Sequence, residues 1–403
     1  MNAMLCTRNL LRSALIASLV LSVSAHAQTF TVLHRFVGKA GGIAPPARVI
    51  GDSAGNLYGI TQSGGSFNFG TVFKLDPNRQ EVVLHSFSAG DGLAPEGSLI
   101  WGKNGVRYGT TYDGGMLQGG KCRHGCGTVF SIDKSGKETV VYAFKGGSDG
   151  ANPGSNLALD PDGNLYGTTF SGGQLSCYVG GCGVIFKIDS SGHQSVLYRF
   201  TDHSDGKSPV GLIRDNAGNL YFTTYDGGTS NLGGIFKLDT TGTLSILHSF
   251  TGGDDSGDPN GSLAGDPSGN LYGATNGNSQ NDFGVIFKID SKGTYSVLYQ
   301  FTSASDGEYP NSLVLDKAGN LYGLTYAGGS GTGCYYDGCG TVFKLDPSNN
   351  KTILHDFAGP DGQLPNGLIL DNAGNLYGTT LGGGNGSGCT YYKGCGTVFK
   401  LVP

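Results

Sequence analysis

Residues 368–380 read LILDNAGNLYGTT, and residues 394–401 read GCGTVFKL. Short runs of Leu, Ile, Val, Tyr and Thr alternate here with Asp, Asn and Gly, the residues that tight turns prefer. The pattern predicts strands over 368–370, 375–380 and 397–401, with a turn over 371–374. In earlier copies a fourth strand follows, for example over 195–200 after the turn 189–192.

Three landmarks of this pattern each occur seven times, in constant order. The Gly-Asn-Leu-Tyr landmark, degenerate in the copy at 106–108, recurs every 50 to 58 residues and places tyrosines at Tyr58, Tyr108, Tyr166, Tyr221, Tyr272, Tyr322 and Tyr377. The Gly-x-x-Phe-Lys-Leu landmark places phenylalanines at Phe73, Phe130, Phe186, Phe236, Phe287, Phe343 and Phe399. The Val-Leu-His/Tyr-x-Phe landmark ends at Phe36, Phe87, Phe144, Phe200, Phe250, Phe301 and Phe357. Repeated four-stranded units predict an all-β fold, a seven-bladed β-propeller.

The order of the landmarks predicts how the ring closes. Residues 32–36 form a fourth strand with no first three strands before it, and the chain ends after a third strand. We therefore expect the N-terminal strand to complete the last blade, which leaves no unpaired blade edge. A linear solenoid is the alternative, but it would not explain why the chain begins with a fourth strand and ends after a third.

The first 27 residues have the pattern of a secretory signal peptide. Arg8 and Arg12 precede an apolar run over 14–21, and residues 25–27 read AHA. The run is too short to span a bilayer, so we expect cleavage after Ala27 and no membrane insertion. This predicts a secreted or periplasmic protein in which residues 28–403 form one propeller domain.

Composition and missing motifs limit the classes of function. The net charge is −5, so no basic face for nucleic acid is expected. The 73 glycines recur at fixed places in the repeat and are interpreted as turn residues rather than as a sign of disorder. The chain has no nucleophile elbow, no phosphate loop before a helix and no metal-spaced His/Glu motif. We therefore expect no cofactor and no metal, and a monomer.

Eight cysteines follow the signal peptide, in four close pairs within the loops between the second and third strands. An even number in an exported chain favours disulfides. Zinc sites typically place two residues between paired cysteines, whereas here the gaps are three to five residues. We predict the disulfides Cys122–Cys126, Cys177–Cys182, Cys334–Cys339 and Cys389–Cys395.

Varied loops on a rigid scaffold are where binding usually occurs. The long loops after second strands and the loops after fourth strands share one face of a propeller, called here the long-loop face. Tyrosines inside the cysteine-closed loops could stack on sugar rings or anchor a protein partner there. Alternatively, they pack over their own disulfides. These candidate ligand-binding residues are Tyr178, Tyr335, Tyr336, Tyr391 and Tyr392.

Other polar residues of the same loops are further candidates. Arg214 breaks the repeat in a first strand, and Arg123-His124 breaks it between two cysteines; such departures mark function or drift. An Asp-Gly pair recurs near a proline, and its carboxylates are expected to ring the central channel. They are interpreted as ligands for calcium, as general acids or as caps of their own turns: Asp91, Asp149, Asp205, Asp306 and Asp361. The landmark histidines alternate with tyrosines between copies and are interpreted as packing residues: His34, His85, His248 and His355.

The strings at 368–380 and 394–401 resemble the GloVer tandem-repeat family of exported bacterial proteins. The resemblance covers nearly all of the chain after the signal peptide. It implies a secreted bacterial protein, often with a C-terminal sorting anchor, and no established activity. This chain stops at Pro403, directly after the last strand, so free secretion or a periplasmic location is expected instead. A looser similarity to NHL-type propellers supports the fold and transfers no function.

The leading hypothesis is a non-catalytic recognition module that binds a glycan or an extracellular protein through the long-loop face. A second hypothesis is a polysaccharide lyase or glycoside hydrolase acting at the channel mouth. A third is a structural component of an envelope or matrix.

Overall fold

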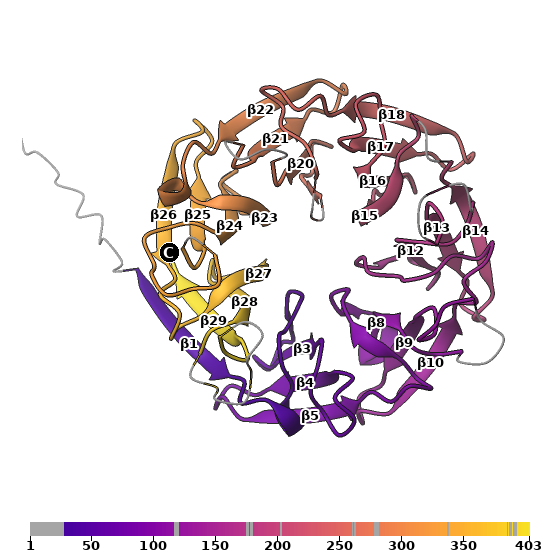
Figure 1. Cartoon of the computed structure of the whole chain (residues 1–403), viewed down its shortest axis with the longest axis horizontal. Coiled ribbons are helices and arrows are strands. Elements are labelled where there is room, and N and C mark those ends of the chain that lie inside the picture. The colour runs from indigo at the N-terminus through magenta and orange to yellow at the C-terminus, as the bar shows by residue number, and fades with distance from the viewer. Residues whose placement is uncertain are drawn as a thin grey trace, which may run out of the picture.

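The computed structural model of the chain describes residues 28–116, 121–174, 177, 180–201, 204–259, 261, 263–277, 282–336, 338–384, 386, 389 and 393–403. Seven antiparallel sheets are arranged around one axis, as predicted from the repeat (Figure 1). The described residues form no α-helix and only three 3-10 turns, η1 (Lys39–Gly41), η2 (Lys103–Gly105) and η3 (Ala304–Asp306).

The strands of each blade are given from the axis outward. Blade 1 consists of β2 (Ile50–Gly51), β3 (Leu57–Thr61), β4 (Thr71–Leu75) and β5 (Glu81–Ser86). Blade 2 consists of β6 (Leu93–Pro95) and β7 (Ile100–Trp101), which both pair with β8 (Arg107–Asp113), then β9 (Thr128–Ile132) and β10 (Glu138–Ala143). Blade 3 consists of β11 (Ala158–Leu159), β12 (Leu165–Thr169), β13 (Val184–Ile188) and β14 (Gln194–Arg199). Blade 4 consists of β15 (Lys207–Arg214), β16 (Leu220–Asp226), β17 (Gly234–Leu238) and β18 (Leu244–Ser249).

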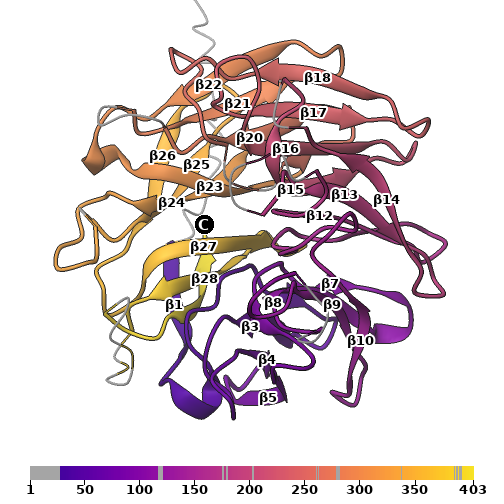
Figure 2. The same cartoon turned by 45° about the vertical axis from the view of Figure 1, so that its right-hand side comes forward.

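The remaining blades follow in the same order around the ring (Figures 1 and 2). Blade 5 consists of β19 (Ala264–Gly265), β20 (Leu271–Ala274), β21 (Val285–Ile289) and β22 (Tyr295–Gln300). Blade 6 consists of β23 (Glu308–Leu315), β24 (Leu321–Ala327), β25 (Thr341–Leu345) and β26 (Lys351–Asp356). Blade 7 consists of β27 (Gln363–Leu370), β28 (Leu376–Gly382), β29 (Thr397–Val402) and β1 (Thr29–Arg35).

The ring closes as the offset of the landmarks predicts. β1 pairs antiparallel with β29, from Thr29 opposite Val402 to Arg35 opposite Thr397. The two ends of the described chain therefore share one sheet (Figure 1). β1 thus supplies the outermost strand of blade 7, and every blade has its outermost strand.

The Gly-Asn-Leu-Tyr landmark is explained by the turn between the first two strands. In blade 1, Asp52 Oδ1 accepts hydrogen bonds from the backbone N–H groups of Ala54 and Asn56, both at 2.9 Å. Its Oδ2 accepts bonds from Asn56 Nδ2 at 2.7 Å and from the Tyr58 hydroxyl at 3.0 Å. The same Asp–Asn–Tyr group recurs in blades 3 to 6, so the landmark encodes a turn that satisfies its own polar groups.

The two phenylalanine landmarks build the core between neighbouring blades. Phe36 of blade 7 and Phe73 of blade 1 are both fully buried, and their ring centroids lie 5.2 Å apart, edge to face. Such pairs recur around the ring. The glycine after the landmark tyrosine makes room for the second ring, because a Cβ at Gly59 would lie 2.5 Å from Phe73 Cζ. Aromatic pairs in this geometry add to the hydrophobic contribution of burial.

The innermost strand differs between blades, and the cause is visible in the sequence. In blades 4, 6 and 7 it is continuous over eight residues, longer than the three predicted for 368–370. These blades have two residues between the strand's proline and the next buried Leu, as in Pro365-Asn-Gly-Leu368. Blade 1 has three, Pro46 to Arg48, between Pro45 and the buried Val49, and its regular pairing is reduced to β2. The extra residue interrupts the strand beside the axis.

Candidate functional site

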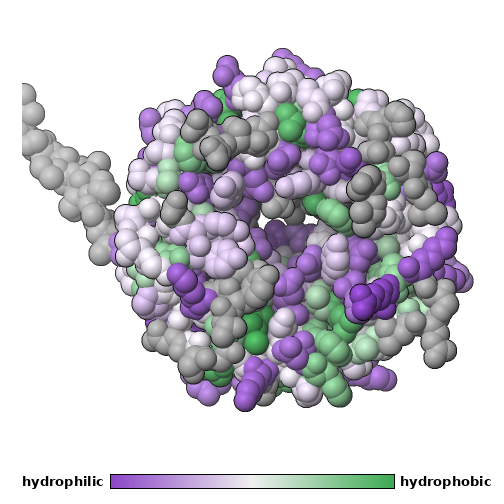
Figure 3. All heavy atoms as spheres, in the orientation of Figure 1, coloured by the Kyte–Doolittle hydropathy of each residue, from purple (hydrophilic) through white to green (hydrophobic). Residues whose placement is uncertain are grey.

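A cavity of about 670 Å³ lies on the propeller axis, which is a volume typical of ligand sites. Its walls come from the innermost strands of blades 4, 6 and 7, from the segments beside the innermost strands of the other blades, from the ends of second strands and from the loop residue Tyr336. Figure 3 shows the hollow at the centre of the ring, with hydrophilic and hydrophobic residues at its edge. Because every blade contributes, residues about fifty positions apart in the chain meet in one site.

Aromatic side chains gather at the cavity. Tyr112, Phe170 and Tyr326 follow the last buried threonine of their blades' second strands, and all three line the cavity. Tyr309 and Tyr336 also line it, and 37% and 46% of their side chains are exposed. The rings of Tyr326 and Tyr336 lie 6.0 Å apart. These rings offer apolar faces of the kind that stack on the C–H faces of sugars.

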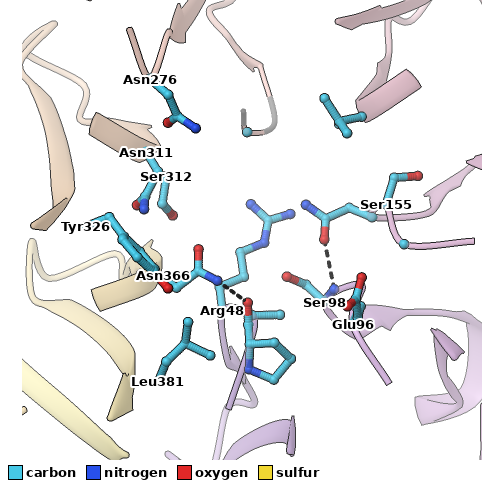
Figure 4. Close-up of a pocket in the computed structure, with 18 of the residues that line it drawn as sticks. Arg48, Glu96, Ser98, Ser155, Asn276, Asn311, Ser312, Tyr326, Asn366 and Leu381 are labelled. Atoms are coloured by element: carbon cyan, nitrogen blue, oxygen red, sulfur yellow. Dashed lines mark hydrogen bonds between the residues drawn. The ribbon is translucent and has the colours of Figure 1, made fainter. Parts of the chain in front are cut away.

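Amide and hydroxyl groups form the rest of the polar wall, and some link neighbouring blades. Asn366 Nδ2 donates to the Pro46 carbonyl at 2.6 Å, and Asn311 Nδ2 donates to the Pro365 carbonyl at 3.3 Å. Asn156 Oδ1 accepts from the Ser98 N–H at 2.8 Å (Figure 4). The Asn311 Oδ1 atom is buried and has no hydrogen-bond partner among the described residues. These amides therefore link neighbouring blades around the cavity.

Two ionisable charges line the described wall, Arg48 and Glu96. Burial raises the pKa of Glu96 to about 7, the repulsion of Asp113 adds to the rise, and the hydrogen bond from Gln62 Nε2 at 3.1 Å opposes it. Burial also lowers the pKa of the Arg48 guanidinium, a group that is not deprotonated in proteins. Figure 4 shows Arg48 extending into the open space of the cavity.

The structure brings part of the predicted tyrosine set to the cavity. Tyr336 is in the wall, and Tyr335 lies beside it with the two rings edge to face at 5.0 Å. About half of the Tyr335 side chain is exposed, and its backbone N–H donates to Gln363 Oε1 at 2.9 Å. Tyr178, Tyr391 and Tyr392 lie outside the described residues.

The four predicted disulfides are confirmed. Cys122–Cys126, Cys177–Cys182, Cys334–Cys339 and Cys389–Cys395 are bonded, with Cα atoms 5.2 to 5.3 Å apart. Each closes a loop after a second strand, and four disulfides indicate an oxidising extracellular or periplasmic environment. Within the described residues, no helix has the length and apolar character to cross a membrane.

The two repeat-breaking candidates lie apart from each other. Arg214 ends β15 beside the first turn of blade 4, donates to the Asp215 carbonyl and packs 5.6 Å from the Tyr166 ring. That is the opposite end of the strand from the cavity, so the expectation that Arg214 lies on the long-loop face is wrong. His124 is exposed on that face and lowers the pKa of Asp113 against the larger effect of burial, but it does not line the cavity.

The expectation that the Asp-Gly carboxylates ring the channel is also wrong. Each one accepts a hydrogen bond from the histidine or tyrosine of an outermost strand, and none lines the cavity. Asp91 Oδ2 lies 2.9 Å from His85 Nε2, and the Tyr142 hydroxyl donates to Asp149 at 3.0 Å. Asp91 Oδ1 also accepts from the Ser88 N–H at 2.6 Å, as a residue capping its own turn does. The same pairing explains why His and Tyr alternate at the strand landmark.

Most of the cavity residues were missed from the sequence, although a signal for them exists. When the copies are aligned, the residue after the second-strand threonine varies widely, from Gln62 and Asn276 to Tyr112 and Leu381. The positions after the innermost proline vary in the same way and include Arg48, Glu96 and Asn366. Variation inside an otherwise constant repeat marks these positions. The structure places residues of both sets in the cavity wall, although Gln62 and Tyr225 of the first set do not line it.

Fold and cavity together define a seven-bladed β-propeller of tandem repeats with a ligand-sized axial site. The profile of the Gloeobacter/Verrucomicrobia repeat matches residues 18–179, 117–266 and 241–403. The chain therefore belongs to the Gloeobacter/Verrucomicrobia repeat family, which confirms the resemblance seen in the sequence. No curated protein matches it significantly.

Solved structures with the same fold have little sequence in common with this chain. A catalytically inactive variant of virginiamycin B lyase from Staphylococcus aureus, solved with quinupristin, is 12% identical, with a TM-score of 0.61 over 93% of this chain and 100% of the lyase. The extracellular domain of the B. thetaiotaomicron one-component system protein BT4673 is 11% identical, with a TM-score of 0.58 over 92% of this chain. That of the hybrid two-component protein BT3049 is 13% identical, with a TM-score of 0.57 over 93% of this chain. This chain spans 39% and 41% of those two solved extracellular chains, and the similarity shows the fold alone.

Proposed function

We propose that this protein is an extracytoplasmic recognition module that binds a glycan in the axial cavity. The observation that carries the proposal is the composition of the wall, where aromatic rings stand beside amide and hydroxyl groups. Aromatic faces pack on sugar rings, and amides exchange hydrogen bonds with sugar hydroxyls. The disulfide-bonded scaffold supports an oxidising compartment, where extracellular glycans occur.

Recognition is favoured over hydrolysis by the charges of the cavity. Most glycoside hydrolases use two carboxyl groups on either side of the scissile bond. Among the described lining residues Glu96 is the single carboxyl group. The wall is thus better suited to hold a sugar than to cleave one.

The test is binding of the purified chain, from residue 28, to a broad glycan array, followed by calorimetry with the tightest ligand. Single variants Tyr112→Ala, Phe170→Ala, Tyr326→Ala and Tyr336→Ala are each expected to weaken binding about tenfold, the effect of losing an aromatic contact at a binding site. Phe67→Ala is the matched control, because Phe67 is 59% exposed and lies outside the cavity wall.

Three results would overturn the proposal. The first is no binding to any glycan. The second is unchanged affinity in all four cavity variants, which would place the site elsewhere. The third is the release of new reducing ends or unsaturated products from a bound polymer, which would establish catalysis instead.

A further inference from the structure

Arg48 is the one cation of the described cavity wall, and it has no partner there. None of the described residues forms a hydrogen bond or an ion pair with its guanidinium, which extends into open space (Figure 4). Glu96, the other ionisable group of the wall, bonds to Gln62 instead. A guanidinium carries five donors in a planar fork, so this one presents its full donor set to whatever enters the cavity.

The other enclosed arginines among the described residues, Arg107 and Arg214, are held by contacts within the fold. Arg107 donates to the Asp133 carbonyl and lies 4.5 Å from the Tyr58 ring centroid. Arg214 donates to the Asp215 carbonyl and packs near Tyr166. Both are held by the fold, whereas Arg48 is not. A partly buried charge without a counter-ion is unfavourable, and a bound anion would remove that penalty.

The position of Arg48 in the repeat shows how it reaches the axis. It lies in the three-residue segment between Pro45 and Val49, just before the innermost strand β2 of blade 1. The aligned residues of blades 2 and 3 are Ser98 and Asn156, which are neutral and also line the cavity. The charge is therefore specific to one blade and is not needed to build the ring.

We propose that the cavity binds an acidic sugar and that Arg48 pairs with its oxyanion, the carboxylate of a uronic acid or a sulfate ester. This inference rests on the proposed function, because the aromatic and amide groups of the wall are what select a sugar rather than a free anion. A bidentate pair between guanidinium and oxyanion fixes the orientation of the sugar ring as well as adding affinity. Glu96 supports the assignment, because burial raises its pKa to about 7 and so reduces its negative charge in the cavity below neutral pH.

The experiment uses an array of uronate-containing and sulfated oligosaccharides, each printed beside its carboxyl-reduced or desulfated counterpart. The chain from residue 28 is expected to bind an acidic member and to lose at least about tenfold in affinity for its neutralised counterpart, the usual cost of losing a charged hydrogen bond. Arg48→Gln should lose a similar factor for the acidic ligand and leave the neutral one unchanged. Arg48→Lys should recover part of the loss, and Arg199→Gln, at an exposed site on β14, should behave as wild type.

The outcomes separate the two proposals. Equal binding of acidic and neutralised members, or unchanged acidic binding in Arg48→Gln, overturns the acidic-sugar inference and leaves glycan recognition standing. Absence of binding to every glycan overturns both. If Arg48→Gln fails to fold, as judged by circular dichroism, the comparison of ligand pairs with the wild-type protein decides the inference. A difference within the uronate pair identifies a carboxylate as the partner of Arg48, and a difference within the sulfated pair identifies a sulfate ester.

Discussion

At the scale of single residues, the seven copies agree where side chains build the blades and differ where they face the axis. The second-strand threonines Thr61 and Thr111 are both buried and hydrogen bond to the next strand. Where the residue after this threonine lines the cavity, as Tyr112 and Leu381 do, it differs in size and chemistry between copies. A copy that keeps its packing residues is free to change its cavity residue, so one scaffold can present a site without symmetry.

Glu138 destabilises the fold when its buried carboxyl group is ionised. It lies beside Asp91 and His85, and its Oε1 atom is buried without a hydrogen-bond partner among the described residues. Burial raises its pKa to about 7, the repulsion of Asp91 adds to the rise, and His85 opposes it. In blade 6, the corresponding Lys351 instead bonds to Asp306 at 2.6 Å.

Because the pKa of Glu138 is higher in the fold than in the unfolded chain, its effect is felt as pH rises from about 4.5 through 7, where ionisation destabilises the fold. Glu138→Gln, which mimics the protonated acid, should match wild type at pH 5 and show a higher Tm at pH 8. Glu138→Lys, which copies blade 6, should raise Tm further at pH 8. Melting curves are followed by circular dichroism in EDTA, which prevents divalent cations from binding to His85, Asp91 and Glu138. Equal Tm differences at both pH values would contradict the prediction.

At the scale of elements, the cysteine-closed loops have different relations to the cavity. The loop closed by Cys334 and Cys339 carries Tyr336, which lines the wall. The loop closed by Cys122 and Cys126 contributes no residue to the wall, and all of its residues are described. Both loops are similarly short, so the two disulfides should contribute similarly to stability while only one of them orders the site.

The paired variants Cys334→Ser/Cys339→Ser and Cys122→Ser/Cys126→Ser separate these effects. Each should lower the free energy of unfolding by about 2 kcal/mol or less, as expected for a bond closing a short loop. Only the first should also weaken ligand binding, because it releases Tyr336. Urea unfolding and calorimetry measure the two quantities. Equal losses of affinity in the two variants would show that the loop does not order the site.

At the scale of the whole molecule, the ring depends on one strand. β1 covers β29, and Phe30 of β1 stacks on His355 of blade 6 with centroids 3.5 Å apart. Phe36, the residue directly after β1, is fully buried and packs against Phe73 of blade 1. These contacts join blades 6, 7 and 1, so closure couples the two ends of the chain.

A chain that starts at residue 37 should therefore lose the propeller's stability. Without β1, the backbone of β29 becomes an exposed sheet edge that can pair with other chains. We expect aggregation in size-exclusion chromatography and loss of a cooperative melting transition, whereas a chain starting at residue 28 should stay monomeric and melt cooperatively. A monomer of unchanged Tm without β1 would refute this role of the strand.

The blades could be foreseen because their causes are local. The turn of Asp371, Asn375 and Tyr377 needs only a few neighbouring residues, and so do the cysteine pairs. Ring closure also followed, since an unmatched first strand and an incomplete last blade imply each other. The turn recurs in six blades and the cysteine pair in four, so chance variation in one copy does not hide them.

The site could not be foreseen in the same way. The wall of the cavity joins Arg48, Glu96, Asn311 and Tyr336, which are far apart in the chain and meet because the ring closes. The two wrong expectations, for Arg214 and for the Asp-Gly carboxylates, have the same cause. The direction of a side chain depends on its hydrogen-bond and packing partners. Asp91 turns to His85 on the outer strand, and Arg214 turns to Tyr166 of the preceding blade. Local pattern thus accounts for seven blades and their order, whereas long-range packing selects which of their variable residues face one another across the axis, because those contacts exist in the closed ring alone.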